Sequence, residues 1–130
     1  MTASFRWLSR RMVEAFHAES LSRFGGAPGI RDEGLLESAL ARPLNAAAYN
    51  PDSTVFDLAA LYCVGIVKNH PFIDGNKRTG LLAGRVFLAL NGYRFAPDEV
   101  QTVLMIRAAA ASEVDEAGLA AWFADNSSPK

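Results

Sequence analysis

The segment from Thr54 to Asn69 restricts the possible folds of this chain more than any other part of it. It opens with Thr54 and Asp57 at the spacing of an N-terminal helix cap, S/T-x-x-D. Hydrophobic residues then occupy nearly every side of the predicted helix: Phe56, Leu58, Leu61, Val64, Ile66 and Val67. A helix that is apolar all round needs other elements around it. The segment therefore predicts the central helix of a bundle, which ends before Pro71 because the residue before a proline is pushed out of the helical region.

The rest of the chain supplies helices that can surround this one. The predicted helices run from Ser9 to about Phe24, from Asp32 to just before Pro43, from Asn76 to Asn91-Gly92, from Pro97-Asp98 through Ile106, and from a cap at Ser112, with Asp115 three residues on, through Phe123. The first of these has Val13, Phe16 and Phe24 on one face, and residues 93–96 are predicted to be extended. We therefore expect an all-α fold: a compact bundle of about six helices, in a single domain over residues 1–130, with room in the loops for a small β-hairpin flap.

Composition excludes several classes of protein. The chain has 13 basic and 14 acidic residues, for a formal net charge of −1, whereas small proteins that coat nucleic acid are usually strongly basic. Cys63 is the only cysteine, so an intramolecular disulfide framework is excluded, as expected in a reducing cytosol. No signal-peptide pattern is visible, and the most apolar run, residues 58–67, is too short to span a bilayer. We expect a cytoplasmic protein with no direct contact to nucleic acid or membrane.

Polar residues concentrate where the central helix ends, in the segment His70-Pro71-Phe72-Ile73-Asp74-Gly75-Asn76-Lys77-Arg78-Thr79. The next helix is predicted to begin near Asn76, and its first backbone N–H groups and positive dipole end suit an anion. Lys77 and Arg78 add a compact charge and a planar guanidinium group there. Cations are unfavourable at this end of a helix unless an anion shares the site. The segment therefore predicts a phosphate site.

Three further residues of the segment suggest chemistry at that phosphate. His70 has a side chain of the type that can accept a proton from an attacking hydroxyl group. Asp74 offers the hard oxygen ligands that Mg²⁺ takes alongside nucleotide phosphates, and Gly75 lets the backbone approach a ligand. Each residue type also has an ordinary structural role, as a cap, a turn residue or a solvated charge, but together they favour a site. It is not a P-loop, because the G-x-x-x-x-G-K spacing and a preceding strand are missing.

Residues 70–79 resemble the signature of the Fic family, in the form found in its death-on-curing (Doc) branch. Two weaker matches flank the signature: Arg23-Phe-Gly-Gly-Ala-Pro-Gly-Ile-Arg-Asp32 and Phe87-Leu-Ala-Leu-Asn-Gly92. Most Fic relatives transfer the AMP of ATP to a protein hydroxyl group, and they have a glycine in place of Lys77 and an arginine in place of Leu81. Both departures are typical of the Doc branch, whose members act as kinases. The resemblance thus implies that the γ-phosphate, and not the α-phosphate, faces His70.

The resemblance also implies roles, cofactors and partners. His70 would be the general base, Asp74 would hold Mg²⁺, and the nucleotide-binding residues for ATP would be Asp74, Gly75, Asn76, Lys77 and Arg78. The protein would be the toxin of a type II toxin–antitoxin system, and it would arrest translation by phosphorylating elongation factor Tu. A cognate antitoxin would lay a disordered segment across the active-site groove. The inhibitory pattern [S/T]-x-x-x-E-[G/N] of some Fic proteins fails here, because Ala117 follows the match from Ser112 to Glu116, and Ser112 is better explained as a helix cap.

Other functions remain open from the sequence alone. The chain could be an adenylyltransferase of the ordinary Fic type, a metal-dependent nuclease toxin, or a degenerate domain that only binds a partner. Arg85 lies about two turns beyond Arg78 and could reach the same anion. His17 and Cys63 lack partners at metal-ligand spacing and are predicted to be ordinary packing residues, while Gly80 and Gly84 share a helix face and predict the close approach of two helices.

Overall fold

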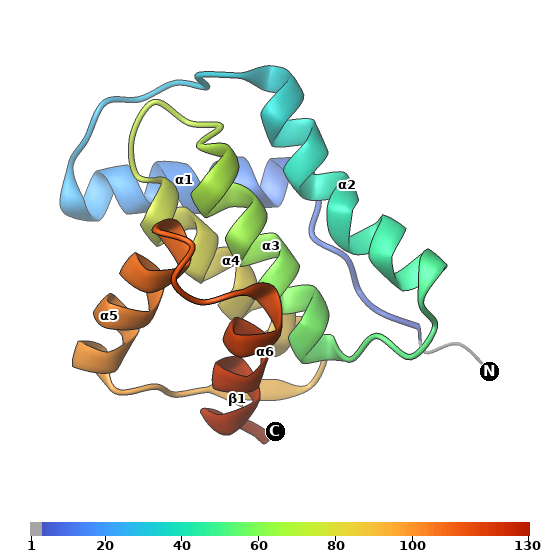
Figure 1. Cartoon of the computed structure of the whole chain (residues 1–130). Helices are drawn as coiled ribbons and strands as arrows, with labels where there is room; N and C mark the ends of the chain where they lie inside the picture. Colours follow the sequence, from blue (N-terminus) through green and yellow to red (C-terminus); the bar gives the residue numbers. More distant parts are fainter. Residues whose placement is uncertain (1–3) are drawn as a thin grey trace.

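The central helix predicted from the sequence is confirmed. The computed structural model describes residues 4–130, and in it α3 (Val55–Asn69) lies in the middle of the bundle (Figure 1). Its cap is the predicted one: the Thr54 hydroxyl group accepts from the Asp57 N–H, and the Asp57 carboxylate accepts from the Thr54 N–H. α3 packs against α2 (Glu33–Tyr49), α4 (Asn76–Leu90), α5 (Glu99–Ala110) and α6 (Glu116–Asp125), while α1 (Arg10–Phe24) packs against α4.

The described residues form six α-helices and one two-stranded antiparallel sheet, so the all-α fold is also confirmed. Four helices begin at the predicted capping signals, where Ser9, Asp32, Thr54 and Asp98 each accept a hydrogen bond from a backbone N–H of the first turn. Within residues 4–130, no helix combines the length and apolar character that crossing a membrane requires.

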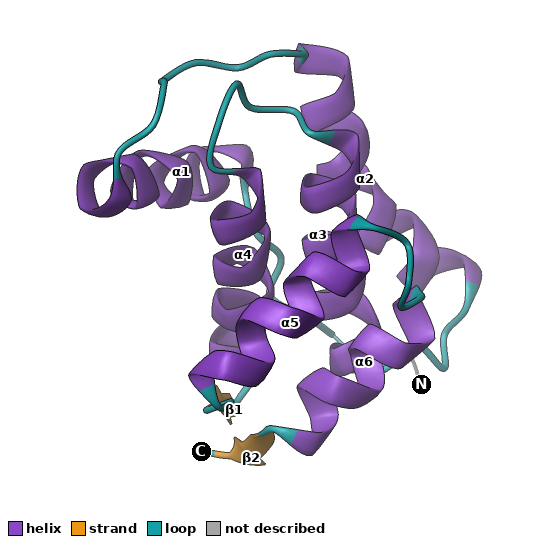
Figure 2. Ribbon diagram, turned by 60° about the vertical axis from the view of Figure 1, so that its left-hand side comes forward, coloured by secondary structure: helices purple, strands orange, loops and turns teal. Residues whose placement is uncertain are grey.

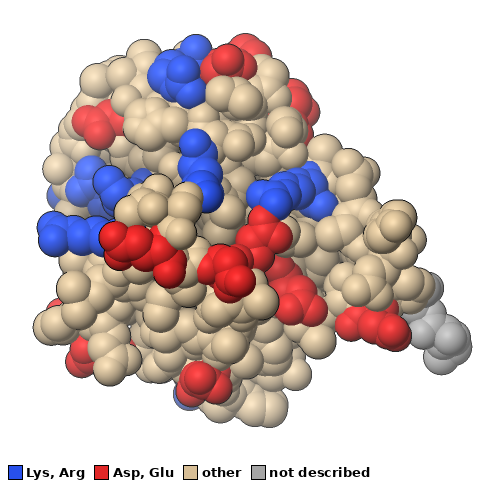
Figure 3. Space-filling model, viewed as in Figure 1, with Lys and Arg blue, Asp and Glu red and all other residues tan. Residues whose placement is uncertain are grey.

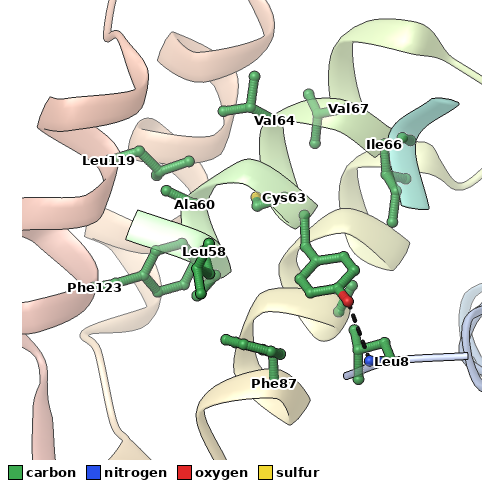
Figure 4. Packing of buried hydrophobic residues seen from close by; sticks show 14 of the residues in the cluster. Leu8, Leu58, Ala60, Cys63, Val64, Ile66, Val67, Phe87, Leu119 and Phe123 are labelled. Atoms are coloured by element: carbon green, nitrogen blue, oxygen red, sulfur yellow. Dashed lines mark hydrogen bonds between the residues drawn. The ribbon is translucent and has the colours of Figure 1, made fainter. Parts of the chain in front are cut away.

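Glycines bring α3 and α4 into close contact, as the sequence predicts. A Cβ atom at Gly80 would lie 2.7 Å from Cγ2 of Val67 and 2.9 Å from the Cys63 carbonyl oxygen, and one at Gly84 would lie 3.3 Å from the Ala59 carbonyl oxygen of α3. The hydrophobic core lies around this contact (Figure 4). Cys63 is a packing residue within it, and burial raises the pKa of its thiol to about 12. The dashed line in Figure 4 marks the hydrogen bond that the Leu8 N–H donates to the Tyr62 hydroxyl group, at 3.1 Å.

The predicted end of α2 before Pro43 is wrong, since the helix continues to Tyr49. Pro43 removes one backbone donor, but it is fully buried against the core and is followed by good helix formers in the run Leu44-Asn-Ala-Ala-Ala48. Burial and helix propensity together outweigh the lost hydrogen bond.

The predicted cap of the last helix is also wrong by three residues. Asp115 is the N-cap of α6, and its carboxylate accepts from the Gly118 N–H at 2.7 Å. Ser112 has a left-handed backbone, with φ of 60°, and its hydroxyl group accepts a hydrogen bond from the Lys68 ammonium group of α3. A contact between distant parts of the chain therefore replaces the local cap.

The small β element is present, but it is not a hairpin. β1 (Tyr93–Phe95) pairs with β2 (Ser127–Pro129), and α5 and α6 lie between them in the chain (Figure 2). The Gly- and Pro-rich loop of residues 25–32 forms only one isolated bridge, between Ile30 and Phe72. That bridge nevertheless places this loop alongside the polar segment that begins at His70.

Candidate functional site: a cationic groove at the start of α4

An open groove of about 750 Å³ lies where α3 ends and α4 begins, with α5 as its far wall. All six residues singled out in the sequence line this groove: His70, Asp74, Gly75, Asn76, Lys77 and Arg78. Val67, Lys68, Val103, Arg107 and Ala110 complete the lining. The size is that of a small-molecule or cofactor site, so the fold brings the predicted residues together around a space that a nucleotide can occupy.

The backbone of His70 is held in an unusual conformation. His70 is the C-cap of α3, with φ of 53° and ψ of 53°, a left-handed state that costs a non-glycine residue about 1 kcal/mol. The guanidinium group of Arg31 donates to the carbonyl oxygens of His70, at 2.7 Å, and of Asn69, at 2.9 Å. The Arg31 N–H donates to Pro71 at 2.6 Å. These contacts fix the direction in which the exposed imidazole leaves the helix.

The start of α4 offers the N–H groups that the sequence predicted. Gly75 is the N-cap in a left-handed conformation, with φ of 78°, and no side chain caps this end of the helix. Asp74 accepts from the Gly75 N–H at 2.9 Å through Oδ1, and from the Ala27 N–H at 3.4 Å through Oδ2. The first turn of α4 therefore remains available to an anion in the groove.

The side chain of Asn76 has a structural role, because it binds the backbone of the loop before α4. It is 4% exposed, its Oδ1 accepts from the Phe72 N–H and its Nδ2 donates to the Phe72 carbonyl oxygen, both at 3.0 Å. These two bonds close the loop from Phe72 to Asn76. A phosphate ligand at this position would therefore use the backbone N–H group and not the amide side chain.

Four cationic side chains line the groove, against a single carboxylate. Lys77 and Arg78 come from α4, Lys68 from α3 and Arg107 from α5. None of the four forms an ion pair with another residue of the described chain. The face drawn in Figure 3 has most of its Lys and Arg side chains in the upper half, where the loop before α4 also lies. The surplus of positive charge in the groove suits a polyanion such as a nucleoside triphosphate.

Phe24 was expected on the same face of α1 as Val13, but the structure places it at the surface beside Arg78. It does not join Val13 in the core but is 65% exposed, and the Arg78 guanidinium group lies 4.8 Å from its ring centroid. A cation over an aromatic ring is stabilised by the ring quadrupole. The end of α1 thus helps to orient Arg78.

Leu81 and Arg85, the next residues along this side of α4, do not add a cation to the groove. Leu81 lies in a smaller, largely apolar hollow of about 170 Å³ that adjoins the groove, between α4 and α5. Arg85 donates to the Phe95 carbonyl oxygen at 3.3 Å, and its guanidinium group lies 5.8 Å from the Phe95 ring centroid. Arg85 is therefore directed to β1.

The comparison with known proteins agrees with this geometry, because residues 7–88 match the sequence model of the Fic/DOC family. The chain belongs to the Fic/DOC family. The match spans α1 to α4 and includes every groove residue that the sequence analysis selected.

Two curated relatives in the Fic/DOC family are Doc proteins by name. The protein named "Protein kinase doc" from Escherichia phage P1 is 37% identical over 87 residues, which cover 67% of this chain and 69% of the phage protein. "Toxin Doc" from Mycolicibacterium smegmatis is 43% identical over 77 residues, which cover 58% of each chain. The chain thus falls in the Doc branch, as its signature indicated.

Three residues near the groove escaped the sequence analysis: Arg31, Lys68 and Arg107. Arg31 lies in the first of the two flanking Fic/DOC segments, but nothing local indicates that its side chain reaches the end of α3. Lys68 and Arg107 are 39 residues apart in sequence and face the same groove only because α5 packs against α3 and α4. The positions of Lys68 and Arg107 at the groove can therefore be seen only in the tertiary structure.

Proposed function

We propose that this protein is a Doc-type toxin that transfers the γ-phosphate of ATP to a hydroxyl group of a target protein. The observation that carries the proposal is the convergence of His70, Asp74, Lys77 and Arg78 on one groove at the start of α4. The likeness to a phage protein named as a kinase supports phosphoryl transfer over other uses of such a groove. Positioning and charge stabilisation are the main requirements of this reaction.

In the proposed reaction, His70 accepts the proton of the target hydroxyl group while its oxygen attacks the γ-phosphorus. The bond between the γ-phosphorus and the bridging oxygen breaks, and ADP leaves with the electron pair. The N–H groups at the start of α4, with Lys77 and Arg78, stabilise the negative charge on the phosphates. The exposed position of His70 leaves space for a target segment to approach from solvent.

Asp74 is the residue proposed to hold Mg²⁺. Within residues 4–130, no group of three or more His, Cys, Asp or Glu side chains is suitably placed to hold a metal ion by itself. One carboxylate beside a phosphate site does fit Mg²⁺, which usually combines one or two protein carboxylates with phosphate oxygens and water. The ion would neutralise phosphate charge. The scarcity of carboxylates argues against a nuclease centre, which commonly uses two metal ions.

The test of this proposal is an assay of the wild-type protein with ATP labelled on either the α- or the γ-phosphate, in parallel reactions with a cell extract. We expect the γ-label, and not the α-label, to appear on a protein, since Lys77 occupies the place that adenylyl-transferring relatives leave open. Mass spectrometry should then find one added phosphate on the target, which we propose to be elongation factor Tu. Transfer of the α-label would instead assign an adenylyltransferase, and transfer of neither label would remove the enzymatic proposal.

The proposed restraint on this activity is a separate antitoxin that lies across the groove. Two exposed apolar side chains near the groove, Phe24 and Ile73, and Val103 in its wall would be covered by such a partner. Expressed alone, the protein should arrest the growth of a bacterial host, and co-expression of its cognate antitoxin should restore growth. Normal growth at a high level of folded protein that still transfers phosphate in vitro would contradict the toxin proposal.

A further inference from the structure

His17 is one of two histidines in the chain, and it was expected to be an ordinary packing residue. It lies on α1 and is 6% exposed. Its ring stacks on that of Phe72, with centroids 3.9 Å apart and an interplanar angle of 10°. Its Nε2 atom lies 2.8 Å from the carbonyl oxygen of Asp74. The packing expectation is therefore correct but incomplete, because the ring also makes a directed polar contact.

The direction of that hydrogen bond follows from its partner. A carbonyl oxygen can only accept, so Nε2 carries the proton and donates it. The bond fixes the peptide that joins Asp74 to Gly75, at the turn into α4. The ring is also close to Gly75, since a Cβ atom there would lie 3.7–3.8 Å from Cδ2 and Nε2 of His17.

Asp74 needs such support because the core does not hold its side chain. The residue is exposed and lines the groove, and within the described chain its carboxylate accepts hydrogen bonds from two backbone N–H groups only, those of Gly75 and Ala27. Its direction therefore depends on the backbone of the loop. The stacked Phe72 is 1% exposed, and its own N–H and C=O are bound by the Asn76 side chain, so His17 connects the turn to a rigid part of the loop.

We propose that His17 is a positioning residue that holds the peptide between Asp74 and Gly75, so that the Asp74 carboxylate and the first N–H groups of α4 face the groove. This inference rests on the proposed function only for the role of Asp74 as the Mg²⁺ ligand. Groups that orient a metal ligand through a hydrogen bond commonly change metal affinity by 10- to 100-fold when they are removed. The effect of His17 should therefore be seen in the dependence on Mg²⁺ more than in the affinity for ATP alone.

Two substitutions separate positioning from packing. His17→Phe keeps the stacked ring and removes the donor, while His17→Gln loses the ring and keeps a side-chain N–H donor. With His17→Phe, calorimetric titrations should show that the Mg²⁺ concentration for half-maximal enhancement of ATP binding rises by about tenfold. ATP binding in the presence of a chelator should be unchanged. His17→Gln should restore part of the Mg²⁺ response, and Glu19→Gln, on the exposed face of α1, should behave as wild type. An unchanged Mg²⁺ response of folded His17→Phe would overturn the inference.

A measurement on the wild-type protein covers the case in which the variants fail to fold or ATP fails to bind. In ¹⁵N-labelled protein, His17 should be the Nε2–H tautomer, with slow exchange of that proton. A His17 in the Nδ1–H tautomer would remove the hydrogen bond and the inference with it. Failure of wild-type protein to bind ATP with Mg²⁺, together with the expected tautomer, would instead count against the proposed function alone.

Discussion

Replacing His70 by alanine should lower the rate of phosphoryl transfer by about 10²–10⁴-fold, the usual contribution of a general base. The imidazole of His70 lines the groove, and histidine is the side chain that most often serves as a general base. ATP binding should persist, because Lys77, Arg78 and the N–H groups of α4 remain. Single-turnover measurements of transfer and calorimetric measurements of ATP binding would separate the two effects.

The folded state should tolerate this substitution. His70 is exposed, and the contacts that hold its backbone use its carbonyl oxygen and the Arg31 side chain. Tyr49→Ala is a suitable control, since Tyr49 is 93% exposed at the end of α2 and does not line the groove. Near-normal transfer by folded His70→Ala would remove His70 from the mechanism and leave the fold and the family assignment intact.

The helices could be predicted where local signals decide them. The caps at Ser9, Asp32, Thr54 and Asp98 are each formed by a side chain and an N–H group three residues apart, so the pattern alone is sufficient. The all-round apolar pattern of α3 likewise requires burial wherever the helix lies. These features need no knowledge of the rest of the fold.

Predictions failed where a distant contact outweighs a local signal. Pro43 is a local stop signal, but its burial against the core lets α2 continue. Ser112 is a good cap by type, but Lys68 from α3 binds its hydroxyl group and Asp115 caps α6 instead. Phe24 has the spacing of a core residue, but it lies under the Arg78 guanidinium group at the surface.

The residues of the site likewise fall into a locally predictable set and a set that depends on distant contacts. The six predicted residues come from one short segment, so their closeness in space follows from their closeness in sequence. The residues that hold them in place or complete the groove belong to other elements: His17 on α1, Arg31 in the loop before α2, and Arg107 on α5. Each acts across more than 25 residues of sequence, so no local pattern could indicate it. A short signature thus contains the proposed reacting groups, while the positions of those groups depend on the whole bundle.

Replacing Lys77 by glycine should lower phosphoryl transfer by about 10- to 100-fold, the range expected for the loss of one charge-assisted hydrogen bond to a phosphate. Lys77 lies in the first turn of α4, is exposed and lines the groove. The dipole at this helix end already repels a cation by a few tenths of a kcal/mol or more, so folding should be little affected by its removal. Lys77→Ala separates loss of the charge from the helix cost of glycine, which is about 1 kcal/mol.

The same substitution tests which phosphate faces His70. A glycine at position 77 reopens the space that adenylyl-transferring relatives keep, so weak transfer of the α-label should appear. It should stay weak because Leu81 lies in an apolar hollow and supplies no second cation from this side of α4. Lys77→Arg should also impair phosphoryl transfer, since a planar fork cannot replace a compact ammonium group. Arg85→Ala, on the same helix but directed to β1, should retain transfer of the γ-label. Undiminished transfer of the γ-label by folded Lys77→Gly would show that Lys77 does not hold the phosphates, and the choice between kinase and adenylyltransferase would then lie elsewhere in the groove.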